Sequence, residues 1–297
     1  MEFRLHVSNC PYSQLVAKSA IWEYSTMDVY RARFLGNGAL RKKWQGSYRV
    51  ITNDNIPTTL ELDCNGGWTV HAEHGSSKGT WACEFRRGRS KSIHHSYLYD
   101  RDLASCNITF NYGITMQSQY RCIFQHQGVI ILALSKGDSI PEGNIEKYSR
   151  CIFLVKEQEG EERPQTLEQF TSYVRDAYLH HLEDEEAITN SSLPPNSIIR
   201  FATALIGTFI TLPIIGLALD IILILPMHLL SASSPFAVAI IYSLLSCVPI
   251  EWWVAKSDDI KRYILNNYIR KHRKQYTESE IAQTPSLQLF DNGWQGK

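Results

Sequence analysis

The chain lacks an excess of charge of either sign. Its 297 residues include 30 lysines and arginines and 30 aspartates and glutamates, so the formal net charge is zero. A protein built mainly to grip the nucleic-acid backbone carries a large basic excess. The composition therefore argues against nucleic acid as a partner.

Paired cysteines and familiar enzyme motifs are also scarce. The seven cysteines are scattered, and no two form a Cys-x-x-Cys pair. We therefore expect free buried thiols rather than a disulfide framework or a zinc site. The chain has no P-loop and no dinucleotide-binding glycine fingerprint. The stretch after Met1 has no apolar core with a cleavage site, so no secretory signal is expected.

Charge is nearly absent from two apolar runs near the C-terminus, Phe201–Leu225 and Phe236–Ala255. Crossing a bilayer core of about 30 Å requires roughly 20 helical residues, and both runs have about that length. The segment between them holds two prolines, three serines and no lysine or arginine. The pattern predicts a transmembrane helical hairpin over residues 201–255, joined to the preceding domain by a linker at residues 191–200.

The charges that flank the two runs predict an orientation. The connecting segment has no basic residue, whereas the chain after the second run is rich in them: Lys256, Lys261, Arg262, Arg270, Lys271, Arg273 and Lys274. The positive-inside rule then places the C-terminal region on the cytoplasmic side, or on the stroma or matrix side of an organelle. Two crossings return the N-terminal domain to that side. The expected partners are membrane lipids and a membrane protein.

Residues 256–297 follow the second run. They predict a basic amphipathic helix, and then a polar tail that is loosely ordered from about Thr277. Four basic side chains of this helix are candidates for contact with lipid headgroups or a partner: Lys261, Arg262, Arg270 and Lys271. A solvated helix docked on the main domain is the alternative.

Asp220 is the one charged residue of the first apolar run. In an antiparallel hairpin its side chain would fall near Tyr242 and Ser243, and a hydroxyl of either residue would satisfy the carboxylate. We expect this hydrogen bond to lock the two helices together. An ion or proton site, or contact with a partner helix, is the alternative.

The first two-thirds of the chain predict an α+β domain. Apolar residues recur at helical spacing over residues 13–35, within an N-terminal segment 1–42, and again over residues 166–187. Between these helices the period changes to two, with eight or nine short strands expected from Lys43 to about Glu157. Short polar turns join them, which favours an antiparallel meander that curls into a barrel or a sandwich. The predicted domain covers residues 43–190, with the second helix packed against it.

Two stretches within residues 43–155 carry a resemblance to a known family. The opening Trp44-x-Gly46-x-Tyr48 resembles the first strand of lipocalin-like (calycin) barrels. The later LELDCNGGWTV and KGTWACEF are similar to the strand and glycine-turn rhythm of those barrels. The resemblance implies a cup that binds a small apolar ligand such as a lipid, a pigment or a tetrapyrrole. The aromatic residues that would line it are Trp44, Tyr48, Trp68 and Trp81.

Two polar clusters are further candidates. The first consists of the histidines at positions 71, 74, 94 and 95 together with Glu73. Histidine and glutamate are residue types that bind transition metals. Neighbouring strand residues point to opposite faces, so we expect solvent-facing histidines and no metal site. The basic cluster Arg86, Arg87 and Arg89 could bind headgroups or a partner. A charged turn around Gly88 is the alternative that we favour.

These observations leave several functions open. The leading hypothesis is a non-catalytic β-barrel protein anchored in a membrane, acting as an accessory or assembly subunit of a membrane complex. The second is a ligand-binding calycin module, which requires an apolar cavity. The third is a membrane-bound enzyme of lipid or cofactor metabolism, which requires polar groups converging in that cavity. The fourth, ion transport through Asp220, requires oligomerisation.

Overall fold

The computed structural model describes these residues: 8–19, 21, 38–53, 56–73, 75–86, 105–112, 116–134, 149–157, 163–189, 196–219, 253, 256, 260, 263, 264 and 266–292. The chain divides into two compact units. Unit 1 comprises Met1–Tyr24, Arg31–Asn190 and His272–Lys297, and unit 2 comprises Ser25–Tyr30 and Ser191–Lys271.

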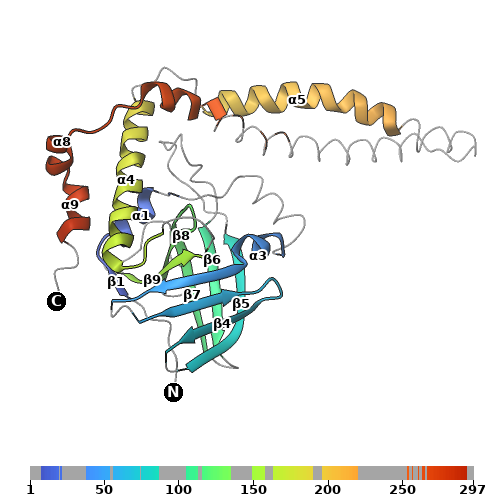
Figure 1. The fold of residues 1–297 in the computed structure, drawn as a ribbon. Coiled ribbons are helices and arrows are strands. Elements are labelled where there is room, and N and C mark those ends of the chain that lie inside the picture. Colours follow the sequence, from blue (N-terminus) through green and yellow to red (C-terminus); the bar gives the residue numbers. More distant parts are fainter. Residues whose placement is uncertain are drawn as a thin grey trace, which may run out of the picture. The chain divides into compact units, whose positions relative to one another are not determined.

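Unit 1 is built around an antiparallel β-barrel (Figure 1). Among the described residues, eight strands follow one another around it: β2 (Gly46–Ile51), β3 (Thr58–Leu62), β4 (Gly67–Ala72), β5 (Gly75–Arg86), β6 (Ser105–Tyr112), β7 (Met116–His126), β8 (Val129–Leu134) and β9 (Ser149–Lys156). Each strand pairs with its neighbour in sequence. The predicted meander that curls into a barrel is confirmed.

Strand β9 closes the barrel. It pairs with β8 on one side, where Ala133 lies opposite Cys151, and with β2 on the other, where Tyr48 lies opposite Lys156. A short strand, β1 (Ser8–Cys10), continues the β2 side of β9. Closure leaves β2 and β8 without open edges, which would otherwise template pairing with other chains. One of the eight or nine expected strands falls at residues 92–98, which lie outside the described residues.

Local sequence explains the tight turns. Between β7 and β8, Gln127 and Gly128 both have positive φ (46° and 78°), as a two-residue type I′ hairpin requires. Between β3 and β4, one carboxylate oxygen of Asp63 accepts hydrogen bonds from the backbone N–H groups of Asn65 and Gly67, at 2.7 and 2.8 Å. Gly128 thus supports the first turn, and the short Asp63 side chain holds the second.

Strand alternation sorts the apolar residues into two cores. Inward-facing side chains from all eight barrel strands form the first, together with Trp44 from helix α3 (Gly38–Trp44). A register irregularity in β7 between Cys122 and Phe124 changes the alternation there. As a result Cys122 belongs to the interior core, whereas the consecutive residues Ile123 and Phe124 both belong to the second core.

The second core lies outside the barrel, between strands β7, β8 and β9 and the helices of unit 1. Helix α1 (Ser13–Ser19) contributes Val16, and helix α4 (Leu167–Thr189) contributes Phe170, whose ring lies 5.0 Å from that of Phe153 on β9. The helix predicted at residues 166–187 is therefore present as α4. Of the helix predicted at 13–35, α1 covers the start, Ile21 is not helical, and 22–37 lie outside the described residues.

The C-terminal segment docks on unit 1 instead of forming a loose tail. It contains helices α8 (Glu278–Gln283) and α9 (Pro285–Asn292), which lie beside α4 (Figure 1). Phe290 and Leu287 of α9 are buried in the outer core. The expectation of loose order from Thr277 is wrong, because apolar residues spaced along α9 find a partner surface on α1 and α4.

Two acidic residues near the end of α4 hold the returning chain. The buried carboxylate of Glu183 accepts a hydrogen bond from the backbone N–H of Tyr276 at 2.9 Å. Asp184 accepts one from Nε of Arg273 at 2.6 Å. Burial raises the pKa of Asp184 above its usual value, and Arg273 partly offsets that shift. Glu183 and Asp184 therefore hold the C-terminal segment against the end of α4.

The prediction of a transmembrane hairpin over residues 201–255 is wrong for the described part of the chain. Within it, no helix combines the length and the apolar character needed to cross a bilayer. Helix α5 (Asn196–Leu219) begins in the expected linker and is described only to Leu219, which is short of the end of the predicted span at Leu225. The predicted integral-membrane localisation, with both flanking regions on the cytoplasmic side, is corrected with it.

Unit 2 brings α5 against a segment far along the chain. A Cβ atom on Gly207 would collide with the ring of Trp253. Glycine at this position therefore lets the indole pack directly on the α5 backbone. The rest of the second predicted run, residues 236–252, 254 and 255, lies outside the described residues.

Candidate functional site

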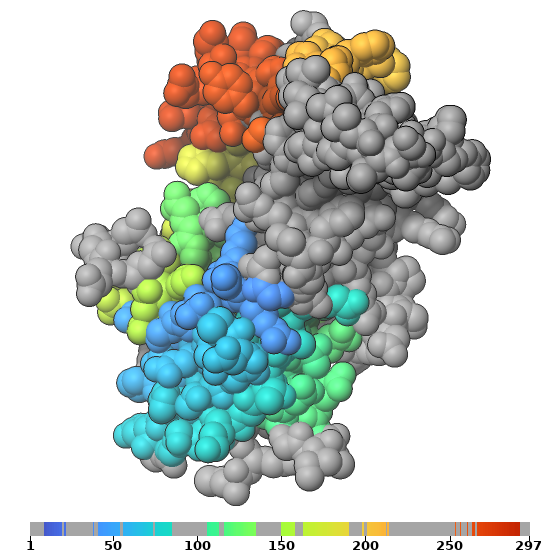
Figure 2. Space-filling view, turned by 90° about the vertical axis from the view of Figure 1, so that its right-hand side faces the viewer, coloured from blue at the N-terminus to red at the C-terminus, as the bar shows by residue number. Residues whose placement is uncertain are grey.

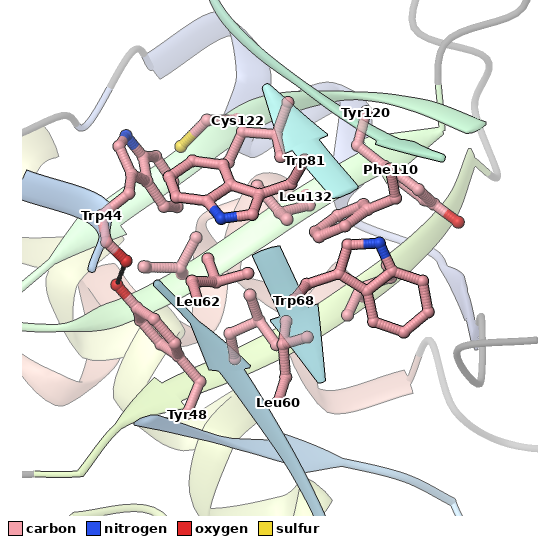
Figure 3. Close-up of a cluster of buried hydrophobic side chains, with 14 of the residues drawn as sticks. Trp44, Tyr48, Leu60, Leu62, Trp68, Trp81, Phe110, Tyr120, Cys122 and Leu132 are labelled. Atoms are coloured by element: carbon pink, nitrogen blue, oxygen red, sulfur yellow. Dashed lines mark hydrogen bonds between the residues drawn. The ribbon is translucent and has the colours of Figure 1, made fainter. Parts of the chain in front are cut away.

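Four aromatic residues predicted to line a ligand cup meet inside the barrel. Trp44, Tyr48 and Trp81, from α3, β2 and β5, gather on one side of the interior, and Trp68 of β4 lies on the other side beside Phe110 (Figure 3). Each of these side chains is only 1–2 % exposed. Residues that line a ligand-sized cavity keep accessible surface facing it, so these four rings pack against protein atoms rather than around a space.

Hydrogen bonds fix the rings in this interior. The hydroxyl of Tyr48 donates to the backbone oxygen of Trp44 at 2.7 Å (Figure 3). The indole N–H of Trp81 donates to the Asp63 carbonyl at 3.1 Å, and that of Trp68 to the Asn111 carbonyl at 3.3 Å. A donor that is already satisfied by the backbone is not free to recognise a ligand.

Gly79 on β5 makes room for one of these rings. A Cβ atom at this position would collide with the Asn111 backbone oxygen and lie 2.7 Å from Nε1 of Trp68. The Trp68 indole therefore lies directly over the β5 backbone, with its ring 6.2 Å from that of Phe110 in an edge-on arrangement. The glycine of the KGTWACEF stretch thus serves packing.

Burial dominates the acid–base properties of the interior. It raises the pKa of the Tyr48 hydroxyl well above the usual value, and the neighbouring Cys122 adds to the shift. Burial also raises the pKa of the Cys83 thiol to about 11, although the nearby Arg41 guanidinium opposes the shift. Both groups stay protonated at neutral pH, so neither supplies a base or a thiolate nucleophile there.

This burial leads to a prediction on thiol chemistry. When the folded protein is alkylated with iodoacetamide at mildly alkaline pH, we expect Cys64 to react and Cys83 to stay unmodified. Cys64 is exposed, whereas Cys83 is buried and its pKa is raised to about 11. Peptide mass spectrometry over time measures both rates. Alkylation of Cys83 at the rate of Cys64 without unfolding would show that the interior is open to solutes.

One enzyme-like pattern lies in strand β5. Residues Gly75–Gly79 read Gly-Ser-Ser-Lys-Gly and match the Gly-x-Ser-x-Gly pattern of hydrolase nucleophiles. That function requires a sharp turn from a strand into a helix. Here the whole stretch is inside β5, and Ser77 pairs with Val70 of β4. The match is therefore a feature of an ordinary strand.

The other predicted polar sites are dispersed or fall outside the described residues. His71 is exposed, and its Nε2 atom lies 3.8 Å from a Glu61 carboxylate oxygen. Among the described residues, no group of three or more His, Cys, Asp or Glu side chains could hold a metal ion. Arg270 and Lys271 are exposed, and Arg86 ends β5. Outside the described residues lie His74, His94, His95, Arg87, Arg89, Asp220, Tyr242, Ser243, Lys261 and Arg262.

The outer surface of the barrel offers no obvious entrance on one side. Side chains of β2–β5 form a continuous surface (blue to cyan in Figure 2). Their outward residues are largely polar, such as Glu61 and His71, whereas their inward residues are buried. This face has the ordinary character of a solvated sheet.

A large exposed apolar surface occurs on helix α5. It consists of Ile198, Phe201, Leu205, Ile206, Phe209 and Ile210, which are 45–72 % exposed and which we call the α5 apolar face. Spacings of three and four residues place Ile198, Phe201, Leu205 and Phe209 along one side of the helix. Gly207, which contacts Trp253, lies two residues from both Leu205 and Phe209 and so on the opposite side.

Comparison with known proteins gives no further guide. No protein-family model, no curated protein and no solved structure matches the chain. The functional argument therefore depends on the filled interior of the barrel and on the α5 apolar face.

Proposed function

We propose that this protein is a non-catalytic β-barrel subunit that assembles with a partner protein, and that the α5 apolar face is its binding surface. The observation that carries the proposal is the exposure of six large apolar side chains on one helix, with Phe201 at 69 % and Phe209 at 72 %. Monomeric soluble proteins rarely expose contiguous apolar patches of this kind, and such patches commonly mark interaction sites.

The barrel supports this assignment by what its interior holds. Eighteen buried residues form the interior core among the described part of the chain, and they include three tryptophans, two tyrosines and a phenylalanine. The Tyr48 phenol and the Cys83 thiol discussed above are held in their neutral forms. A barrel whose interior is packed in this way is a rigid scaffold rather than a ligand-binding cavity.

We propose that the chain shares the architecture of calycin barrels but not their ligand binding. The up-and-down order of the strands and the helix packed outside support it. The exposures of only 1–2 % for Trp44, Tyr48, Trp68 and Trp81 weigh against extending it to a bound lipid, pigment or tetrapyrrole.

Site-specific photocrosslinking tests the proposed function. A photoreactive phenylalanine analogue replaces Phe209 in the full chain, and irradiation is carried out in cells. We expect one adduct of defined mass, because an aromatic ring at the centre of an interface is surrounded by partner atoms. The matched control places the same analogue at Met116, which is 48 % exposed on β7 and lies outside α5. Equal adducts at both positions, or none at Phe209, would contradict the proposal.

A further inference from the structure

The α5 apolar face carries no charge of its own. All six of its side chains are aliphatic or phenylalanine. Two copies of this face can therefore meet without bringing like charges together, which would otherwise cost binding energy. The whole chain also has a formal net charge of zero, so long-range repulsion does not oppose association of two copies.

The exposed area is sufficient for a stable dimer. From the exposed fractions of its six residues, and taking about 150–250 Å² for a fully exposed large side chain, the face offers about 540–900 Å² per chain. Two copies would then bury up to about 1,100–1,800 Å², which overlaps the range of about 1,200–2,000 Å² that specific interfaces bury. A smaller face would need additional contacts from elsewhere.

The arrangement of unit 2 suits a self-complementary interface. One side of α5 is occupied by Trp253 at Gly207, and the apolar face lies on the other side. A helix that is covered on one side and apolar on the other can pack its apolar side against the same helix of a second copy. Two-fold symmetry permits this, because an isologous interface uses the same patch on both subunits.

We infer that the protein forms a homodimer in which the α5 apolar faces of two copies pack against each other. This inference rests on the proposed function and names the partner as a second copy of the chain. Phe201 and Phe209 are the central anchors, because aromatic side chains contribute most to interface energy. The barrels of the two copies are then joined through their unit 2 segments.

Sedimentation velocity on the purified full chain in detergent-free buffer tests the inference. Over a concentration series we expect a species of twice the 34.0 kDa chain mass. The Phe209→Asp variant should fall to half that mass, because each dimer would bury two carboxylates in its interface. The Met116→Asp variant carries the same change at an exposed position of unit 1 and should remain dimeric. Far- and near-UV circular dichroism verifies that both variants are folded.

A second measurement does not depend on an aspartate variant. Photocrosslinking of the purified protein through the analogue at Phe209 should give one band at twice the chain mass, and mass spectrometry should find the crosslinked peptide within residues 196–219 of a second copy. If the wild type is monomeric and Phe209 crosslinks to a different protein in cells, the dimer is wrong and the proposed function stands. If it is monomeric and no adduct forms in cells, both are wrong. A monomer that instead floats with phosphatidylcholine vesicles also overturns the dimer.

Discussion

Replacing Trp81 with alanine is expected to lower the free energy of unfolding by about 3–5 kcal/mol, the usual cost of truncating a buried aromatic residue. The ring is 2 % exposed in the interior core, and its N–H donates to the Asp63 carbonyl. Truncation removes this packing, leaves a cavity and removes one of the two hydrogen bonds to the Asp63 carbonyl, the other coming from the Gly66 backbone N–H. Domain stabilities are commonly about 5–15 kcal/mol, so the loss is a large fraction of the total. Chemical denaturation followed by circular dichroism measures it.

The same substitution separates a filled barrel from a ligand cup. If Trp81 lined an open cavity, its truncation would enlarge existing space and cost little. A loss below about 1 kcal/mol would contradict the filled interior, because burial of an aromatic side chain contributes more than that. The control is Trp81→Phe, which keeps an aromatic ring and should be less destabilising than alanine.

Replacing Phe290 with alanine is expected to cost a similar amount, about 3–5 kcal/mol. The Phe290 ring stacks on that of Tyr12 with centroids 4.5 Å apart, and lies 5.6 Å from that of Tyr178. One side chain thus joins α9 to Tyr12, just before α1, and to α4. Its loss should release the C-terminal helices before the barrel unfolds, and hydrogen exchange should show faster exchange in α8 and α9 than in β8 and β9.

Leu289 provides the matched control for Phe290. It lies next to Phe290 in α9 but is 41 % exposed, so Leu289→Ala should cost less than about 1 kcal/mol. Equal losses for the two variants would show that the segment does not dock as described. Unchanged hydrogen exchange in α8 and α9 of Phe290→Ala would contradict the role of this ring in joining the helices.

Sequence reasoning predicted the strands well because their signal is local. Leu60 and Leu62 alternate with Glu61, and Trp68 and Val70 alternate with Thr69, so each short segment shows which of its faces is apolar. Asn65, Gly66 and Gly67 likewise indicate a turn without reference to the rest of the chain. The meander order follows because short connections favour pairing between sequence neighbours.

The C-terminal segment was missed, although its sequence contains a signal. Thr277 and Glu280 form a capping box, in which the Thr277 hydroxyl accepts from the Glu280 backbone N–H and the Glu280 carboxylate accepts from the Thr277 backbone N–H. This motif commonly marks a helix start when apolar residues follow, as Ile281 and Leu287 do here. The overall polarity of the segment concealed it. Its docking depends on Tyr12 and Glu183, which are far away in sequence.

The apolar run at residues 201–225 shows a different limit. Its length and low charge match the requirements of a membrane span, yet no described helix qualifies as one. Hydropathy reports only that such side chains avoid water. It does not distinguish lipid from another protein surface, so the proposed binding role of the α5 apolar face comes from its exposure in the structure and not from composition.

By itself, the sequence determined the strand positions, the turns, the long helix after the barrel and the apolar character of α5. Each of these follows from residues that are neighbours along the chain. Only the tertiary structure decided that β9 closes the barrel, that Trp44, Tyr48, Trp68 and Trp81 are buried in it, and that α9 packs on α4 and Tyr12. The physical reason is that burial is a property of contacts between distant residues. Periodicity shows which side chains leave water, and the packed fold shows what they meet.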